Sequence, residues 1–167
     1  MTVERSEPPY IADERASLRA WLDFHRATLL LKCEGLDEAG LNARPIPSST
    51  LSLHGLLRHL SEVERNWFRL VLGGEDAGWL YCDDAHEDGD FELAEDADWS
   101  VDLATWLAEC ENSRRLEIAA PSLDVTGLRR DELVDLRWIM VHMIEEYARH
   151  NGHADLIREL VDGTVGE

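Results

Sequence analysis

Histidine and glutamate residues recur at intervals of three and four positions near the end of the chain, at His142, Glu146, His150 and His153. On an α-helix this spacing places the four side chains on one face. At 100° per residue they fall within an arc of about 80°, which also contains Ile139. The stripe that is expected to face the core therefore carries a carboxylate and several imidazoles. Burying a carboxylate costs several kcal/mol unless it is paired, hydrogen-bonded or bound to a cation, so the pattern indicates a metal site.

An earlier helical segment carries His59 on its apolar face. In a helical bundle His59 could meet Glu146 and His150, since bundle cores build metal sites from facing helices. Two imidazoles and one carboxylate leave coordination positions open, and they suit zinc, nickel or ferrous iron. We expect His142 and His153 to support the site rather than bind the ion, because a third imidazole from one helix would need a wider arc.

Each of these residues also has an ordinary structural interpretation. A histidine on an apolar face, such as His59, is often a hydrogen-bonded core residue. Glu146 could pair with an arginine such as Arg19 or Arg58. Spacing alone leaves both interpretations open.

Four amphipathic helices account for most of the chain, and no segment is a confident strand. We expect Asp13 and Ser100 to cap the first and third helices, and His54 to be exposed because it lies off the apolar arc. The pattern predicts a single all-α domain over residues 1–167, an antiparallel up-and-down four-helix bundle. The expected helices are about Asp13–Cys33, Leu51–Leu72, Ser100–Ala119, and a fourth from Asp131 or Asp135 to Val161.

Two connections separate the first three helices. Residues 36–50 contain prolines and a Ser-Ser-Thr run, as is typical of a loop. A second connection is strongly acidic between residues 83 and 98, but it lacks the glycine and final glutamate of an EF-hand calcium loop. We therefore expect a solvated loop, with His86 at its surface. Its acids are Asp83, Asp84, Glu87, Asp88, Asp90, Glu92, Glu95, Asp96 and Asp98.

The charge of the protein argues against nucleic acid and anionic membranes as partners. The 167 residues include 35 acidic and 16 basic ones, for a formal net charge of −19, and Lys32 is the single lysine. A nucleic-acid surface needs clustered basic residues, and an anionic membrane repels an acidic protein. No apolar run is long enough to span a membrane.

The cysteines and tryptophans bear on location and assembly. Three separated cysteines, Cys33, Cys82 and Cys110, fit a reducing cytoplasm and no disulfide framework. The N-terminal residues contain no signal-like apolar segment, so we expect a cytoplasmic protein. Large apolar side chains make a homodimer plausible. The tryptophans are Trp21, Trp67, Trp79, Trp99, Trp106 and Trp138.

Two segments resemble the DinB/YfiT-like superfamily of metal-binding four-helix bundles. Residues 56–68, with a histidine followed by an aromatic pair, resemble that family's second helix. Residues 145–153, Glu-Glu-Tyr-Ala-Arg-His-Asn-Gly-His, resemble its fourth-helix motif and especially an uncharacterised actinobacterial branch. The resemblance extends from the first helix to Leu160.

The resemblance implies that His59, Glu146 and His150 bind a divalent metal. The chain departs from the pattern at Glu146, where most relatives have histidine, and at His153, where they have glutamine. The distantly related mycothiol-dependent maleylpyruvate isomerases also have glutamate at the first position, so metal binding is still expected. The change at His153 could alter hydrogen bonding around the ligands.

The resemblance also implies a function. Characterised relatives use the ion to activate a low-molecular-weight thiol such as mycothiol for transfer or isomerisation. We expect a metal-dependent transferase that joins such a thiol to an electrophilic small molecule, with zinc as the preferred metal and nickel or iron as alternatives. His142, Tyr147 and His153 are expected to lie around the ligands or in the pocket. A non-catalytic metal-binding or small-molecule-binding stress protein and a metal-dependent hydrolase are the alternatives.

Overall fold

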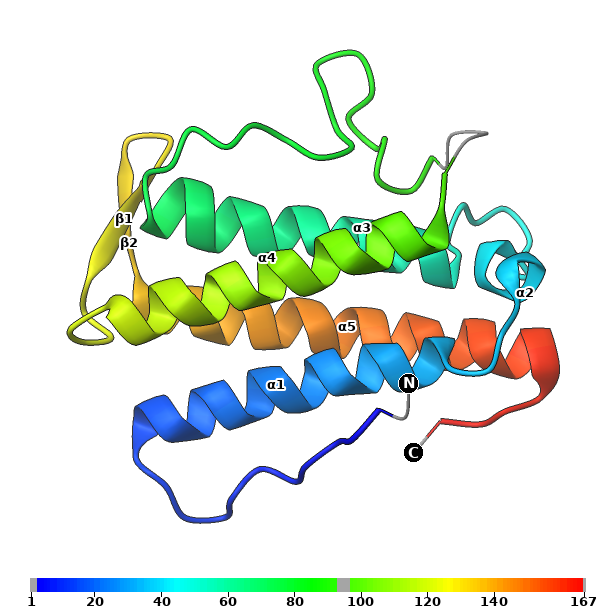
Figure 1. Ribbon diagram of the computed structural model, residues 1–167, viewed down its shortest axis with the longest axis horizontal. Coiled ribbons are helices and arrows are strands. Elements are labelled where there is room, and N and C mark those ends of the chain that lie inside the picture. Colours follow the sequence, from blue (N-terminus) through cyan, green and yellow to red (C-terminus); the bar gives the residue numbers. More distant parts are fainter. Residues whose placement is uncertain (1–2, 93–96, 167) are drawn as a thin grey trace.

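The computed structural model describes residues 3–92 and 97–166 and is mostly helical (Figure 1). A short β-hairpin precedes the last helix. The elements are α1 (Glu14–Cys33), α2 (Glu38–Asn42), α3 (Leu53–Glu64), the π-helix η1 (Arg65–Leu72), α4 (Trp99–Ala119), β1 (Thr126–Arg129), β2 (Glu132–Asp135) and α5 (Leu136–Asp162). Within these described ranges, no helix is both long and apolar enough to cross a membrane.

The helices α1, α4 and α5 begin at capping aspartates, which accept hydrogen bonds from otherwise unpaired backbone amides. Asp13 caps α1, as expected, and Asp135 caps α5, which is the later of the two expected starts. The prediction that Ser100 caps the third helix is wrong. Asp98 takes that position and accepts from the backbone amides of Ser100 and Val101.

The helices pack in pairs, α1 against α5 and α3 against α4 (Figure 1). The expectation that successive helices alternate in direction fails for α3 and α4. His54 at the start of α3 contacts Trp99 at the start of α4, and Gly73 after η1 lies beside Leu116 near the end of α4. The two helices therefore run the same way, because the chain between them returns along the length of the molecule (Figure 1).

Three short features differ from the predicted pattern. The connection over residues 36–50 contains the five-residue helix α2. The second predicted helix changes at Arg65 from α-helix to the wider π-helix. The segment before α5 forms a two-stranded antiparallel hairpin whose turn residues, Arg130 and Asp131, both have positive φ, as a tight hairpin turn requires.

A glycine fixes the hairpin against the end of η1. A Cβ at Gly127 would lie only 2.1 Å from the carbonyl oxygen of Val71, so no larger residue fits without displacing one of the two backbones. This contact holds the hairpin against η1. Because β2 ends directly before α5, the hairpin also lies beside the first turn of α5.

A buried carboxylate links four helical segments in the core. Glu64 is fully buried and accepts two hydrogen bonds of 2.7 Å from Arg26 of α1. Ser113 of α4 donates to it at 2.5 Å and Tyr147 of α5 at 2.8 Å. Burial alone would raise the pKa of Glu64, but Arg26 and the hydroxyl donors overcome this and lower it. The carboxylate therefore stays charged inside the bundle.

The prediction of an exposed His54 is wrong. Its side chain is fully buried, with Nδ1 2.8 Å from Asn42 and Nε2 2.8 Å from Asp102. The short helix α2, which carries Asn42, covers this position, and no sequence pattern indicated that helix. His86 is exposed, as expected, and lies beside Asp83.

Candidate metal centre

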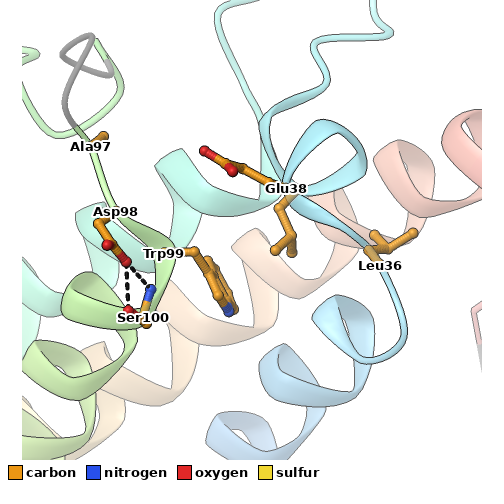
Figure 2. A pocket seen from close by; sticks show the side chains of 7 residues that line it. Leu36, Glu38, Ala97, Asp98, Trp99 and Ser100 are labelled. Atoms are coloured by element: carbon orange, nitrogen blue, oxygen red, sulfur yellow. Dashed lines mark hydrogen bonds between the residues drawn. The ribbon is translucent and has the colours of Figure 1, made fainter.

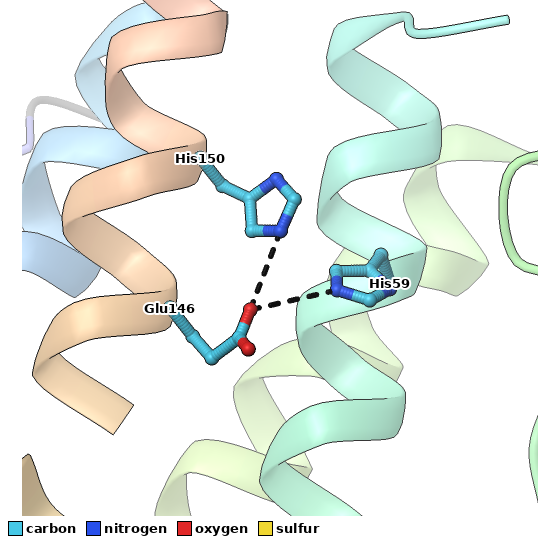
Figure 3. A group of neighbouring side chains, drawn as sticks. All are labelled: His59, Glu146 and His150. Atoms are coloured by element: carbon cyan, nitrogen blue, oxygen red, sulfur yellow. Dashed lines mark ion pairs between the residues drawn. The ribbon is translucent and has the colours of Figure 1, made fainter. Parts of the chain in front are cut away.

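Three predicted ligands, His59, Glu146 and His150, converge between α3 and α5 (Figure 3). Glu146 Oε2 lies 3.9 Å from His59 Nε2 and 3.4 Å from His150 Nε2. One ligand atom from each residue lies within 4.8 Å of the others. The four-residue spacing on α5 places Glu146 and His150 on adjacent turns of one face, and α3 supplies His59 from the opposite side.

The arrangement fits a divalent ion. Two ligand atoms bound tetrahedrally to zinc at 2.0–2.2 Å lie about 3.4 Å apart, so the observed separations need only small side-chain movements. The side chains are partly accessible, with exposed fractions of 22% for His59, 13% for Glu146 and 9% for His150. Two imidazoles and one carboxylate leave coordination positions for a small molecule.

Asp90 contacts the His59 ring nitrogen that does not face Glu146. Its carboxylate lies 2.7 Å from His59 Nδ1, and Asp90 is only 5% exposed. The Phe91 ring stacks on the imidazole at 4.7 Å. Such a carboxylate fixes the proton on Nδ1, so that Nε2 presents its lone pair to an ion. The expectation of a solvated acidic loop therefore fails at Asp90.

The acidic segment reaches His59 because α3 anchors it. Glu62 Oε1 accepts hydrogen bonds from the backbone amides of residues 80–82. Arg58 donates to the Gly89 carbonyl at 3.1 Å and stacks on the ring of Tyr81 at 4.2 Å. Nothing in the sequence distinguished Asp90 from its acidic neighbours. Two of these, Glu95 and Asp96, lie outside the described residues.

His153 supports His150 in a similar way. The two Nδ1 atoms are 3.3 Å apart, so one ring donates to the other. Burial, with the charges of His150 and Arg149, lowers the pKa of His153, so its neutral ring can accept a hydrogen bond from His150 Nδ1. In that arrangement His150 directs Nε2 toward Glu146.

His142 lies one turn before Glu146, with its Nε2 3.6 Å from Glu146 Oε1. Its ring stacks on Trp138 at 4.9 Å and meets the edge of Trp67 at 4.7 Å. Burial lowers the pKa of His142 despite the nearby carboxylates of Glu146 and Glu145. His142, Glu145 and Glu146 form a second group with ligand atoms in reach of one another, but Glu145 is exposed and pairs with Arg149.

The protonation of the cluster depends on its carboxylates. Burial alone would lower the pKa of His59, but its hydrogen bond to Asp90 and the charges of Asp90 and Glu146 raise it to about 9. The nearby imidazoles of His150 and His59 lower the pKa of Glu146. An ion that binds must therefore displace a proton from His59, which makes metal affinity depend on pH.

A comparison with family models decides the family. The mycothiol-S-transferase model matches residues 17–163, which include all three clustered residues. The chain belongs to this family. It is a member of the DinB-like superfamily, so the resemblance seen in the sequence is confirmed, and its mostly helical structure is compatible with that fold. No curated protein is significantly similar to the chain.

Family membership indicates a mycothiol-related transferase, and a small molecule as its substrate. The clustered histidines and glutamate of this family member provide candidate metal ligands.

Tyr147 lies away from the cluster. Its hydroxyl donates to Glu64 and accepts from the Trp106 indole at 2.9 Å, so it belongs to the buried core network. The two arginines considered as partners of Glu146 also lie elsewhere. Arg19 binds Glu117, and Arg58 binds the acidic segment.

A separate hollow of about 410 Å³ lies between α2 and the start of α4 (Figure 2). Leu36, Glu38 and Trp99 are among the residues that line it. None of its lining residues belongs to the cluster, and we assign this hollow no part in the chemistry of the family.

Proposed function

We propose that this mycothiol-S-transferase family member is a divalent-metal-dependent enzyme that transfers a mycothiol-type thiol to an electrophilic small molecule. The observation that carries the proposal is the cluster of His59, Glu146 and His150, in which both imidazoles have an outer partner at Nδ1. If Glu146 were only a core carboxylate paired with one histidine, the two imidazoles would not need these partners at Nδ1.

His59, Glu146 and His150 would hold the ion, and we favour zinc over nickel or ferrous iron. A bound divalent ion supplies Lewis acidity, which lowers the pKa of a thiol beside it. Asp90 and His153 orient the two imidazoles. Phe91 covers one face of His59 and excludes water there.

His142 is placed to accept the proton that the thiol loses. Its side chain is partly exposed, its Nε2 lies 3.6 Å from Glu146, and its lowered pKa keeps the ring neutral near pH 7. A neutral imidazole at the edge of the cluster can take a proton and pass it to solvent.

Metal content tests the ligand assignment. Purified protein should contain about one divalent ion per chain, and His59→Ala and Glu146→Ala should each lose it. His86→Ala is the matched control, because His86 is an exposed histidine whose ring lies beside Asp83 and is not part of the cluster. Retention of the full metal content in both ligand variants would contradict the assignment.

A conjugation assay tests the reaction. Mycothiol and monochlorobimane should give conjugate faster with the loaded enzyme than with chelator-treated protein, and added metal should restore the rate. His142→Gln should slow conjugation while keeping the ion. If a panel of thiols reacts no faster than with the apo-protein, the protein is not a thiol transferase, and metal-dependent hydrolysis or non-catalytic binding becomes the better explanation.

A further inference from the structure

A second hollow, of about 330 Å³, lies between the β-hairpin and the first turn of α5. The indoles of Trp67 and Trp138 line it, 5.0 Å apart. Trp138 is 48% exposed, so part of its indole is accessible to a ligand. We call this hollow the tryptophan pocket, and its lining residues are Trp67, Arg129, Glu132, Leu133, Val134, Asp135 and Trp138.

The tryptophan pocket and the metal cluster lie along one face of α5. Trp138, His142 and Glu146 follow one another at four-residue intervals. Trp138 stacks on His142, and His142 lies 3.6 Å from Glu146. Eight helical residues advance about 12 Å, so the pocket lies about that far from the cluster along the helix axis.

The lining of the pocket combines aromatic faces with hydrogen-bonding groups of both kinds. Arg129 lies 4.7 Å over the Trp67 ring and has no carboxylate partner in the part of the chain that the structure describes. Glu132 is likewise without an ion pair in that part. The Asp135 carboxylate accepts a hydrogen bond from the Trp138 amide with one oxygen, and its other oxygen lies 3.9 Å from Arg137 Nη1. A ligand here meets N–H donors from Arg129 and carboxylate acceptors beside the indoles.

This chemistry fits a sugar or another polyol. The C–H faces of such a ring lie against an indole, while its hydroxyl groups both donate and accept hydrogen bonds. An anionic aromatic molecule fits less well, because Glu132 and Asp135 would oppose its charge. A purely apolar one would leave the charged groups desolvated without partners.

We propose that the tryptophan pocket binds the sugar portion of the thiol whose sulfur reacts at the metal cluster. The proposal rests on the proposed function. The distance between the cluster and the pocket supports it as well as the chemistry of the lining. One extended residue spans only about 3.5 Å, so a simple cysteine cannot reach from the cluster to the pocket. A thiol carried on a sugar reaches both, so the pocket selects sugar-linked thiols over small ones.

Calorimetry with S-methylated mycothiol tests the pocket separately from the reaction, because the blocked sulfur cannot react. It should bind wild-type protein, and Trp138→Ala should weaken binding roughly tenfold or more, as removal of a central aromatic contact does. Arg129→Gln should weaken it as well. Trp21→Ala is the matched control, because Trp21 is a similarly exposed indole on α1, at 44%.

Activity then gives a second readout. Trp138→Ala should keep its metal and raise KM for mycothiol. Equal affinity of wild type and Trp138→Ala for S-methylated mycothiol would overturn the proposal even if conjugation occurs. A raised KM for monochlorobimane alone would also overturn it, because the pocket would then hold the electrophile. Pocket-dependent binding without any conjugation would support the sugar site and count against the transferase.

Discussion

Asp90 shows how one residue outside the ligand set can determine the chemistry of a cluster. His59 could be an ordinary hydrogen-bonded core histidine, and its bond to Asp90 is compatible with that role. The same bond also orients Nε2 toward Glu146, 3.9 Å away. The two roles differ in what happens to metal affinity when Asp90 loses its charge.

Asp90→Asn should lower metal affinity by about 10–100-fold, because an outer carboxylate fixes the tautomer and raises the basicity of a ligating imidazole. Competition with a chromogenic chelator measures this. Asp84→Asn is the control, since Asp84 is an exposed acid of the same segment. Equal metal affinity in Asp90→Asn and wild type would show that Asp90 serves only the packing of the segment.

Individual elements take their positions from buried charges and from one close backbone contact. The Glu64 carboxylate joins α1, α3, α4 and α5, and the π-helix begins at the next residue. A charged network that is fully bonded fixes how its helices pack, because any shift leaves a buried charge without a partner.

Ser113→Ala should destabilise the protein by about 1.5–3 kcal/mol at pH 7, because it removes a hydrogen bond to a charged group. The pKa of Glu64 is lowered in the folded state, so its bonds stabilise the fold above the ordinary glutamate pKa of 4.5 and lose that effect as pH falls below it. The difference between wild type and Ser113→Ala should therefore shrink as pH falls from 4.5 through the lowered pKa of Glu64 in the folded protein. Urea unfolding at several pH values measures both.

Thr105→Ala is the control for that series, because the Thr105 hydroxyl donates to the Val101 carbonyl within α4 rather than to a carboxylate. Its effect should be smaller and nearly independent of pH. A pH-independent cost for Ser113→Ala would contradict the assigned role of the Glu64 charge.

Gly127→Ala should destabilise the protein by about 1–3 kcal/mol, because the added methyl group meets the Val71 carbonyl. The same change at Gly152 in α5, where nothing lies within 4 Å of an added Cβ, should be neutral or stabilise by up to about 1 kcal/mol. Thermal unfolding compares the two. A harmless Gly127→Ala would mean that the hairpin is not fixed against η1.

Across the molecule, the excess of acidic over basic residues has two roles. Most acids are exposed and keep the protein soluble, which is what a net charge of −19 suggests. Several others are buried and paired with cations from other helices, as Glu109 is with Arg65 and Arg69 of η1. The net charge alone does not reveal that some acidic side chains are buried and paired with arginines.

A metal that joins α3 to α5 should stabilise the whole domain. At a free concentration of 100 times Kd, the expected gain is about 2.7 kcal/mol, or a rise in Tm of roughly 5–10 °C for a chain of this size. Calorimetry with and without a chelator measures the shift, which Glu146→Ala should abolish. Identical melting of the loaded and chelated protein would argue against an ion held between these helices.

The local features of this protein can be predicted from its sequence alone. Helical periodicity and end signals located the four long helical segments to within a few residues, and the spacing of Glu146 and His150 placed them on one face of α5. These are properties of neighbouring residues and follow from helix geometry alone. The resemblance carried by the His59 segment and the α5 motif identified the superfamily.

Contacts between side chains that are far apart in the sequence depend on the tertiary structure. Asp90 is one acid among many in the sequence, and it reaches His59 because Glu62 and Arg58 anchor its segment on α3. His54 lies off the apolar stripe, yet α2 covers it. The parallel course of α3 and α4 depends on a long connection whose path no local pattern specifies. Contacts of this kind form by packing between segments far apart in the chain, so periodicity cannot predict them.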